Sequence, residues 1–482
     1  MKPMSKRLHN IAIGMLIAFL ITALHLTFWS AIERDALRAR ADNPRRLEDE
    51  RAIVRGSIVD RNSVALARSE PSVRLPSGRM AQRRVYPQPS AFSVTGYYSL
   101  IYGSSGAEFA FDRALRGAEH MDLWSAVLNE ALNRPPRGAD LRLTVDAHLQ
   151  AIAAAAFGDR RGAAVLLEVP SGAIWALYSA PLYDPNTLDA DWERLRNDPN
   201  APLLNRALQG VYQPGSALQL IIYAAMLANP ALQPSDLASA TAPLSLDGAV
   251  VPCLAESPLP LESLQSALAR SCPSLFAEFA VQYPAEVQEK IEAFGLLSLP
   301  RLNGYPMAAE PRFRPLQALS EPAERLREGV GQGSLTVTPL QMALVASGIA
   351  NYGNIVAPYI AEALRAPDSE QWTPVPRSQL ERAAITREAA EQLRAAMREA
   401  TLSGAAQAAR LPELPPEVTL YAHLGLAFSG ARQDGWLIGF VDLPDGRALA
   451  AAVLVESVAE AQTAARIGGQ LLAAAARRAL QN

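Results

Sequence analysis

An uncharged apolar run near the N-terminus restricts this chain more than any other stretch. Residues 11–32 contain no Asp, Glu, Lys or Arg, and a run of this length can cross a bilayer as a helix. It is too long for the apolar core of a signal peptide, and no clear small-x-small cleavage site follows it. We therefore expect an uncleaved, single-pass membrane anchor over 11–32, with a cytoplasmic tail over 1–10 and a charged juxtamembrane linker over 33–52.

Basic residues do not decide the orientation of this anchor. Lys2, Lys6 and Arg7 precede the run, and several arginines follow it, so the usual excess of positive charge on the cytoplasmic side is not evident. Long domains cross a membrane largely regardless of their charge. We therefore expect the bulk of the chain to be extracytoplasmic.

The rest of the chain is long and apolar enough to fold around large cores. It has 482 residues in all, of which 49% are hydrophobic. The formal net charge of -3 gives no support for nucleic-acid binding, and we expect none. No histidine lies near either cysteine, Cys253 or Cys272, in the sequence, so we expect no metal site. Outside the cytoplasm the two cysteines can form a disulfide; two independent buried thiols are the alternative.

Lysine is nearly absent from the sequence, which limits the chemistry that the chain can perform. The lysines are Lys2, Lys6 and Lys290, so a single lysine is available beyond the N-terminus. Lys290 lies in the mixed-charge stretch 284–291, which is typical of an exposed helix. Arginine supplies most of the remaining positive charge.

A serine stands where a turn passes into an apolar helix. Pro214 and Gly215 set a tight turn, and the apolar run 220–227 follows. Ser216 can cap the helix, which is the commonest role of a serine at this position. The alternative is a nucleophile at the positive end of the helix dipole.

Strand and helix patterns flank this turn on both sides. Alternation and turn residues predict strands over 141–146, 162–169 and 173–179, with a hairpin turn at 170–172. Apolar spacing predicts helices over 148–157 and 459–480. The polar, proline-bearing stretches 366–377 and 411–416 are predicted surface connections.

Several segments resemble those of class B penicillin-binding proteins. Residues 53–62 are similar to the Arg-Gly-x-Ile-x-Asp-Arg-Asn-Gly segment that opens the extracytoplasmic part of that family, with Ser63 where glycine is usual. The resemblance is most specific over 331–343, which is similar to the family's Gly-Gln-Gly…Thr-Pro-Leu-Gln-Met-Ala stretch. Shorter similar segments lie at 94–98, 106–108, 115–117, 349–353 and 436–440.

The resemblance implies an α+β fold in two parts beyond the membrane helix. A serine transpeptidase/β-lactamase-like domain over 141–482, with an antiparallel sheet, helices on both faces and a helical subdomain, would stand on a smaller pedestal domain over 53–140. The implied activity is that of a peptidoglycan D,D-transpeptidase, which uses no cofactor. The implied partners are a peptidoglycan stem peptide or a β-lactam, a polytopic glycan polymerase and other cell-wall synthesis proteins.

The first catalytic motif of that family is altered in this chain. The family places a lysine three residues after its nucleophilic serine, one helical turn away and on the same helix face. Here Ser216 matches the serine and Gln219 stands at the lysine position. A glutamine side chain cannot accept a proton usefully near neutral pH.

The second and third motifs are altered as well. The family's Ser-x-Asn segment corresponds to Ser271 with Pro273 in place of the asparagine. Its Lys-Thr-Gly segment, which binds the substrate carboxylate, corresponds to His423, Leu424 and Gly425. Losing a whole catalytic group costs at least the ~10²–10⁴-fold that a general base contributes.

These substitutions predict a catalytically impaired member of the family that acts as a scaffold or binding subunit. One alternative is an active D,D-transpeptidase that uses Ser216 as its acyl-accepting nucleophile and His423 as a substitute base. Another is a receptor that binds wall fragments or β-lactams without reacting. The simplest interpretation of Ser271 is a helix-start serine beside Cys272, and a lone histidine is more often structural than catalytic.

Overall fold

The computed structural model separates the chain into two compact units. The first consists of Met1–Val54, Ser69–Arg83 and Met121–Arg137, and the second of Arg55–Arg68, Arg84–His120 and Gly138–Asn482. The residues that the structure describes are 3–28, 44–118, 132, 134–234, 237, 240–246, 249–255, 261–310, 313–377, 382–429 and 432–481.

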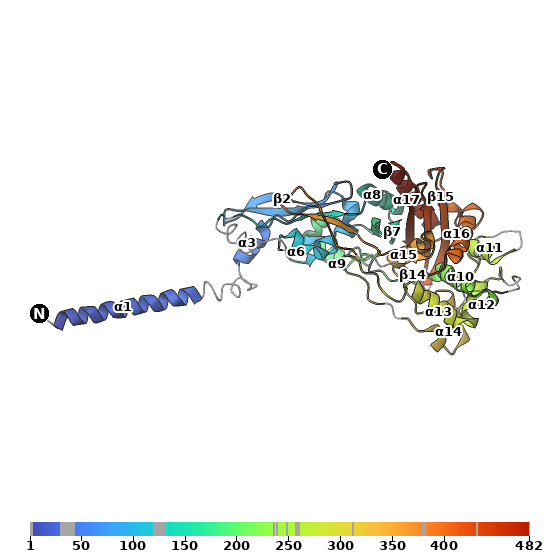
Figure 1. The fold of residues 1–482 in the computed structure, drawn as a ribbon, viewed down its shortest axis with the longest axis horizontal. Coiled ribbons are helices and arrows are strands. Elements are labelled where there is room, and N and C mark those ends of the chain that lie inside the picture. Colours follow the sequence, from blue (N-terminus) through green and yellow to red (C-terminus); the bar gives the residue numbers. More distant parts are fainter. Residues whose placement is uncertain are drawn as a thin grey trace. The chain divides into compact units, whose positions relative to one another are not determined.

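The first unit contains the N-terminal apolar helix. Helix α1 spans Pro3–Thr27, and its stretch His9–Thr27 is long and apolar enough to cross a membrane; Figure 1 shows it in dark blue. Residues 29–32 of the predicted anchor, and 33–43 of the predicted linker, lie outside the described residues. Helix α3 (Pro44–Ala52) follows, and Ala52 packs with Leu75 and Ala81 in a small core.

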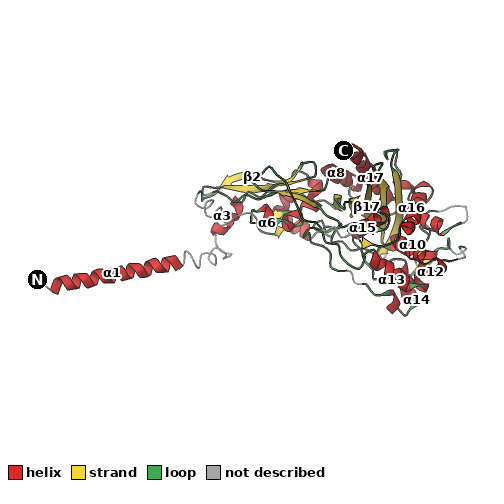
Figure 2. Cartoon of the chain, viewed as in Figure 1, coloured by secondary structure: helices red, strands yellow, loops and turns green. Residues whose placement is uncertain are grey.

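The second unit is built on a five-stranded antiparallel sheet (Figures 1 and 2). The strand order is β15-β16-β17-β7-β8, so β15 is an edge strand. Strands β7 and β8 are the hairpin that the sequence predicts around residues 170–172. The strands span Thr419–Ser429 (β15), Arg432–Asp442 (β16), Ala448–Val455 (β17), Gly162–Val169 (β7) and Ile174–Ala180 (β8).

Helices cover both faces of this sheet, as the family resemblance implies. Helix α15 (Pro339–Ala350) packs on one face, and α8 (Ala147–Phe157) and α17 (Gln462–Gln481) pack on the other. Alternate residues of one strand enter different cores: Val165 joins the core that contains α15, and Leu166 joins the core that contains α17. Because both faces are covered, the strands are apolar throughout rather than alternating with polar residues.

Further helices form the predicted helical subdomain. Helix α11 contacts α16, α12 contacts α14, and α10 contacts α13, while α16 also contacts strand β15. The helices span Gln219–Ala228 (α10), Leu264–Ala269 (α11), Ser274–Gln282 (α12), Pro284–Ala293 (α13), Pro322–Gly329 (α14) and Arg387–Leu402 (α16).

A second sheet joins strands that are far apart in the sequence. Its order is β13-β12-β6-β1-β2-β3. Strand β12 ends just before the predicted surface connection 366–377, and β13 lies within it. The two strands pair with each other, and β12 also pairs with β6. Only Ile58–Val59 of the strand-like segment 53–62 forms a strand. The six strands span Thr373–Pro374 (β13), Ala361–Arg365 (β12), Asp140–Leu143 (β6), Ile58–Val59 (β1), Ala65–Arg74 (β2) and Met80–Val85 (β3).

Small elements complete the described chain. They are α4 (Phe92–Thr95), β4 (Tyr98–Ser99), β5 (Gly103–Ser104), α5 (Gly106–Ala110), α6 (Asp112–Leu115), α9 (Leu188–Arg196), β9 (Leu244–Leu246), β10 (Ala249–Val251), β11 (Asn354–Ile355) and β14 (Arg382–Ala383).

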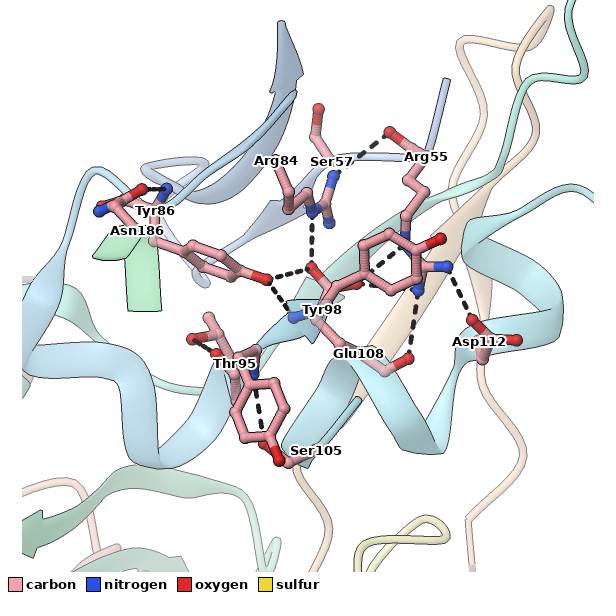
Figure 3. A network of polar contacts seen from close by, with 12 residues as sticks. Arg55, Ser57, Arg84, Tyr86, Thr95, Tyr98, Ser105, Glu108, Asp112 and Asn186 are labelled. Atoms are coloured by element: carbon pink, nitrogen blue, oxygen red, sulfur yellow. Dashed lines mark hydrogen bonds and ion pairs between the residues drawn. The ribbon is translucent and has the colours of Figure 1, made fainter. Parts of the chain in front are cut away.

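A buried carboxylate organises the part of the second unit near its first strand (Figure 3). The fully buried Glu108 accepts hydrogen bonds from Arg55 Nη2 at 2.9 Å and from Arg84 Nε at 2.6 Å. Arg55 also donates to Asp112 at 2.7 Å. Burial opposes the charge of Arg55, but the carboxylates of Glu108 and Asp112 outweigh it and raise the pKa of the guanidinium. The family-like segments 53–62 and 106–108 are therefore joined here by buried ion pairs.

Candidate active site

Ser216 lies on a short 3-10 turn, Gly215–Leu218, which leads directly into helix α10. The turn rests against the edge strand β15. Gly215 has a positive φ of 54°, and a Cβ atom there would lie 2.2 Å from the carbonyl oxygen of Leu426. Only glycine allows this approach, because any side chain would collide with the strand. A Cβ atom on Gly425 would likewise lie 2.6 Å from the backbone nitrogen of Ala217.

The hydroxyl of Ser216 is turned toward the strand. Its Oγ accepts a hydrogen bond from the backbone N–H of Leu426 at 2.8 Å. Neither the 3-10 turn nor α10 has a side-chain cap, and their cap positions are Pro214 and Leu218. The prediction that Ser216 caps the helix is therefore wrong, because the glycine turn brings the strand N–H within reach of the hydroxyl.

Gln219 is a buried amide with both polar atoms unpaired. Its side chain is 3% exposed, and neither Oε1 nor Nε2 has a hydrogen-bond partner within the described part of the chain. Gln219 and Ser216 share a cavity of about 10 Å³, roughly the room that one water molecule needs. No titratable side chain is among the described residues that line it, which also include Pro273, Gln332 and Phe428.

His423 lies beside Ser216 but contacts a different atom. Its Nε2 is 3.1 Å from the carbonyl oxygen of Ser216, not from Oγ. A carbonyl oxygen only accepts hydrogen bonds, so in the tautomer that makes this bond Nε2 carries the proton and cannot take another from the hydroxyl. Burial of the ring lowers the pKa of His423 to about 4. The side chain is therefore neutral near pH 7, without the charge that a lysine would offer a substrate carboxylate.

The second motif faces the same strand. Ser271 lies in the turn between α11 and α12 with a φ of 52°, so the prediction of a helix-start serine is wrong. Its Oγ donates to the carbonyl oxygen of Leu424 at 2.6 Å. Pro273 immediately precedes α12, where its missing N–H costs nothing. The side chain of Leu424 belongs to the core that contains α17, as the strand alternation requires.

Three side chains form hydrogen bonds with main-chain groups along the free edge of β15, one at every second residue. Ser271 binds the carbonyl of Leu424, Ser216 binds the N–H of Leu426, and Gln332 Oε1 accepts from the N–H of Phe428 at 3.0 Å. An exposed strand edge with unpaired groups would otherwise invite an additional strand. Sequence reasoning missed Gln332 as a site residue, although it stands inside the Gly-Gln-Gly stretch that carries the family resemblance.

The loop that bears Gln332 is held by Gln213. Its Nε2 donates to the carbonyl oxygens of Gln332 and Gly333, both at 2.9 Å. Trp436 on β16 donates in turn to the carbonyl oxygen of Gln213 at 3.1 Å. The turn before Ser216, the loop and the sheet therefore form one hydrogen-bonded frame.

The two cysteines are joined. Cys253 and Cys272 form a disulfide across a sequence separation of 19 residues, which is the first of the two predicted alternatives. The bond ties the segment after β10 to the turn that holds Ser271. The residues that the structure describes contain no cluster of side chains suited to hold a metal ion.

Two family models match the chain. One, described as the penicillin binding protein transpeptidase domain, matches residues 162–479. The other, described as the penicillin binding protein A dimerisation domain, matches residues 55–141.

The chain is also similar to named relatives and solved structures. It is 36% identical over 389 residues to the peptidoglycan D,D-transpeptidase PbpA of Mycolicibacterium smegmatis, with 76% of each chain covered. It is 31% identical over 494 residues to PbpA of Mycobacterium tuberculosis, with 98% of this chain and 97% of the relative covered. A structure of penicillin-binding protein A from M. tuberculosis, an imipenem acyl-enzyme complex, matches 88% of this chain and 99% of its own with a TM-score of 0.74 and 31% identity.

Proposed function

The chain belongs to the penicillin-binding protein transpeptidase family of peptidoglycan synthesis, and from that premise we propose that it is a catalytically impaired member. It acts as a membrane-anchored scaffold or binding subunit of the cell-wall synthesis machinery. A polytopic glycan polymerase is the partner that this role requires, because a subunit without its own chemistry must act through an enzyme.

The surroundings of the Ser216 hydroxyl carry this proposal. Acyl transfer needs a group that removes the serine proton as the new bond forms. The hydroxyl oxygen receives a hydrogen bond from the N–H of Leu426, while Gln219 is a neutral amide and His423 points a protonated nitrogen at a carbonyl oxygen. The described lining of the cavity therefore offers a donor to the oxygen and no base for the proton.

The capped edge of β15 supports the same conclusion. An extended peptide that binds beside a strand does so through the free main-chain groups of its edge. One such group of each of Leu424, Leu426 and Phe428 already bonds to a side chain of the same chain. A stem peptide would have to displace three hydrogen bonds, each worth about 0.5–1.5 kcal/mol, before it could align with Ser216.

A scaffold needs a stable fold, and the rest of the structure provides one. The sheet is covered on both faces, and the buried Glu108 is bonded by both Arg55 and Arg84 (Figure 3). Neither feature depends on the catalytic groups. Loss of catalysis with the fold preserved is therefore physically consistent.

Covalent labelling tests the proposal directly. The full chain, held in lipid nanodiscs, is incubated with a fluorescent penicillin and its intact mass is measured. We expect no added mass, and the same result for Ser216→Ala. Acylation of the unchanged chain that disappears in Ser216→Ala would overturn the proposal. Co-purification of a glycan polymerase with both forms is the positive result that the scaffold role requires.

The alternative function is an active D,D-transpeptidase with a rewired site. It is favoured by the names of the relatives at 31–36% identity, which are D,D-transpeptidases. It requires the ring of His423 to leave the Ser216 carbonyl and reach Oγ. Turnover of a D-Ala-D-Ala stem peptide that is lost in both Ser216→Ala and His423→Ala would establish it, and an unchanged rate in His423→Ala would exclude the histidine as the base.

A further inference from the structure

A second cavity in the larger unit has no part in the site described above. It lies between α13, α15, the loop 298–301 and the segment 355–358, and it shares no lining residue with the cavity at Ser216. Its volume is about 250 Å³, slightly below the usual range of small-molecule sites. Phe294, Leu344, Ile355 and Val356 form a buried apolar wall.

Two guanidinium groups stand at the rim of this cavity. Arg301 and Arg382 both line it and are both exposed. Within the described part of the chain neither has a carboxylate partner; the side chain of Arg382 donates only to the carbonyl oxygen of Glu292, at 3.5 Å. The carboxylate of Glu292 accepts instead from Gln288 Nε2 at 3.0 Å. Among the residues that the structure describes, no neighbouring acid therefore forms an ion pair with either guanidinium.

The buried polar group in the wall is already satisfied. Gln341 Nε2 donates to the carbonyl oxygens of Leu296 and Ser298 at 3.1 and 3.0 Å, and its Oε1 accepts from the N–H of Thr338 at 2.9 Å. The apolar wall therefore offers apolar contact, while the two guanidinium groups, which have no ion-pair partner among the described residues, lie at the rim. A molecule that matches both has an apolar body and one anionic end.

We propose that this cavity binds a small amphipathic anion, with a medium-chain alkyl or similar apolar body and a carboxylate or phosphate head. The body lies against Phe294, Leu344 and Ile355, where apolar surface leaves water. The head lies between Arg301 and Arg382, whose planar forks match the oxygens of either group. Binding needs no reaction and does not involve Ser216.

Equilibrium dialysis tests the site on the full chain in lipid nanodiscs, with empty nanodiscs as background. The probes are radiolabelled octanoate and octyl phosphate, and neutral octanol serves as a competitor without charge. We expect saturable binding of at least one anion at one molecule per chain, with octanol competing at least tenfold less well. The better of the two anions identifies the head group.

Charge variants separate this site from adsorption to lipid. Arg301→Gln and Arg382→Gln should each weaken the dissociation constant about tenfold or more, because each removes a charge-assisted hydrogen bond. The matched control Arg196→Gln, an exposed arginine on α9 that does not line the cavity, should leave it unchanged. Binding that does not saturate above background, or that survives the double variant, would overturn the proposal, as would equal binding of octanol.

Discussion

At the residue scale, the central feature is the Ser216 hydroxyl, whose neighbours differ chemically from those that the family resemblance implies. Ser216 is buried at the start of an apolar helix and bonded to the edge strand. Gln219 and His423 stand at the positions that the family resemblance assigns to lysines, and both are uncharged near neutral pH. Among the described residues that line the cavity, the site therefore positions an oxygen and presents no titratable side chain.

His423 should make the folded state sensitive to acid. The folded pKa is about 4, and an unperturbed histidine titrates near 6.5, so the unfolded chain binds the extra proton between these values. The contribution of His423 to the free energy of unfolding is therefore fully present above pH 6.5. It falls by about 3 kcal/mol as the pH drops toward 4. When the free energy of unfolding is measured with urea across this pH range, the His423→Asn variant should not show this part of the loss in stability.

The control for this prediction is His148→Gln, which changes an exposed histidine on α8 and should retain the full acid dependence. Carboxylates also titrate in this range, so the comparison between the two variants, rather than either curve alone, isolates His423. Identical curves for both variants would contradict the assignment.

Gln219 should be replaceable by an apolar residue with a gain in stability. Its two polar atoms are buried without partners in the described structure, and such atoms cost about 1–3 kcal/mol. We expect Gln219→Leu to raise the free energy of unfolding by about that amount. Gln150→Leu is the matched control: that buried amide bonds Ser90 and Leu177, and its loss should destabilise. A clear loss of stability in Gln219→Leu would show that the amide holds a water or a ligand.

At the element scale, the edge of β15 is protected by side chains rather than by another strand. Ser271, Ser216 and Gln332 come from three segments far apart in the sequence. All three bonded main-chain groups lie on the same side of the strand, because the groups that face one side of a strand belong to every second residue. Three of the main-chain groups that another strand could pair with are thereby occupied.

Removing one of these caps should open the strand locally. Gln332→Ala leaves the N–H of Phe428 without its acceptor, which should cost about 1–3 kcal/mol. Hydrogen–deuterium exchange at Phe428 should become faster, and a D-Ala-D-Ala peptide should gain access to the edge. Gln407→Ala, at an exposed position whose amide bonds only Leu402, should change neither quantity. Unchanged exchange in Gln332→Ala would refute the capping role.

The disulfide should support the turn that carries Ser271. Closing a loop across 19 residues restricts the unfolded chain by about 3 kcal/mol in the loop-entropy model. We expect the paired variant Cys253→Ser with Cys272→Ser to lose stability by about this amount, and a reducing agent to produce the same loss in the unchanged chain. A reducing agent that lowers the stability of the double variant as well would point to another cause.

At the scale of the whole molecule, the chain combines a membrane-competent helix with a large folded unit. Stretch His9–Thr27 meets the length and composition needed to span a bilayer. The larger unit keeps both cores, the covered sheet and the Glu108 network. The proposed scaffold role requires these two features and no catalytic group.

Membrane attachment should depend on α1 alone. The full chain should stay in the membrane fraction after carbonate washing, and protease added from the extracytoplasmic side should degrade the large unit. Deletion of residues 1–28 should release a folded protein into the soluble fraction. Retention of the deletion variant in washed membranes would show that another surface binds lipid.

The apolar N-terminal helix and the hairpin β7–β8 could be predicted from the sequence, because each depends on composition or spacing within a short stretch. The three altered motifs likewise rest on the residues of short segments and stay a prediction. Tertiary structure alone decided what those motifs do. Ser216 and Leu426 are 210 residues apart, and their hydrogen bond exists because glycine lets the turn meet the strand. The pairing of β12 with β6, the contact of His423 with a carbonyl rather than a hydroxyl, and the role of Gln332 likewise arise between distant segments. Local patterning specifies which face of an element is buried, whereas the partner it meets is specified only when the whole chain packs.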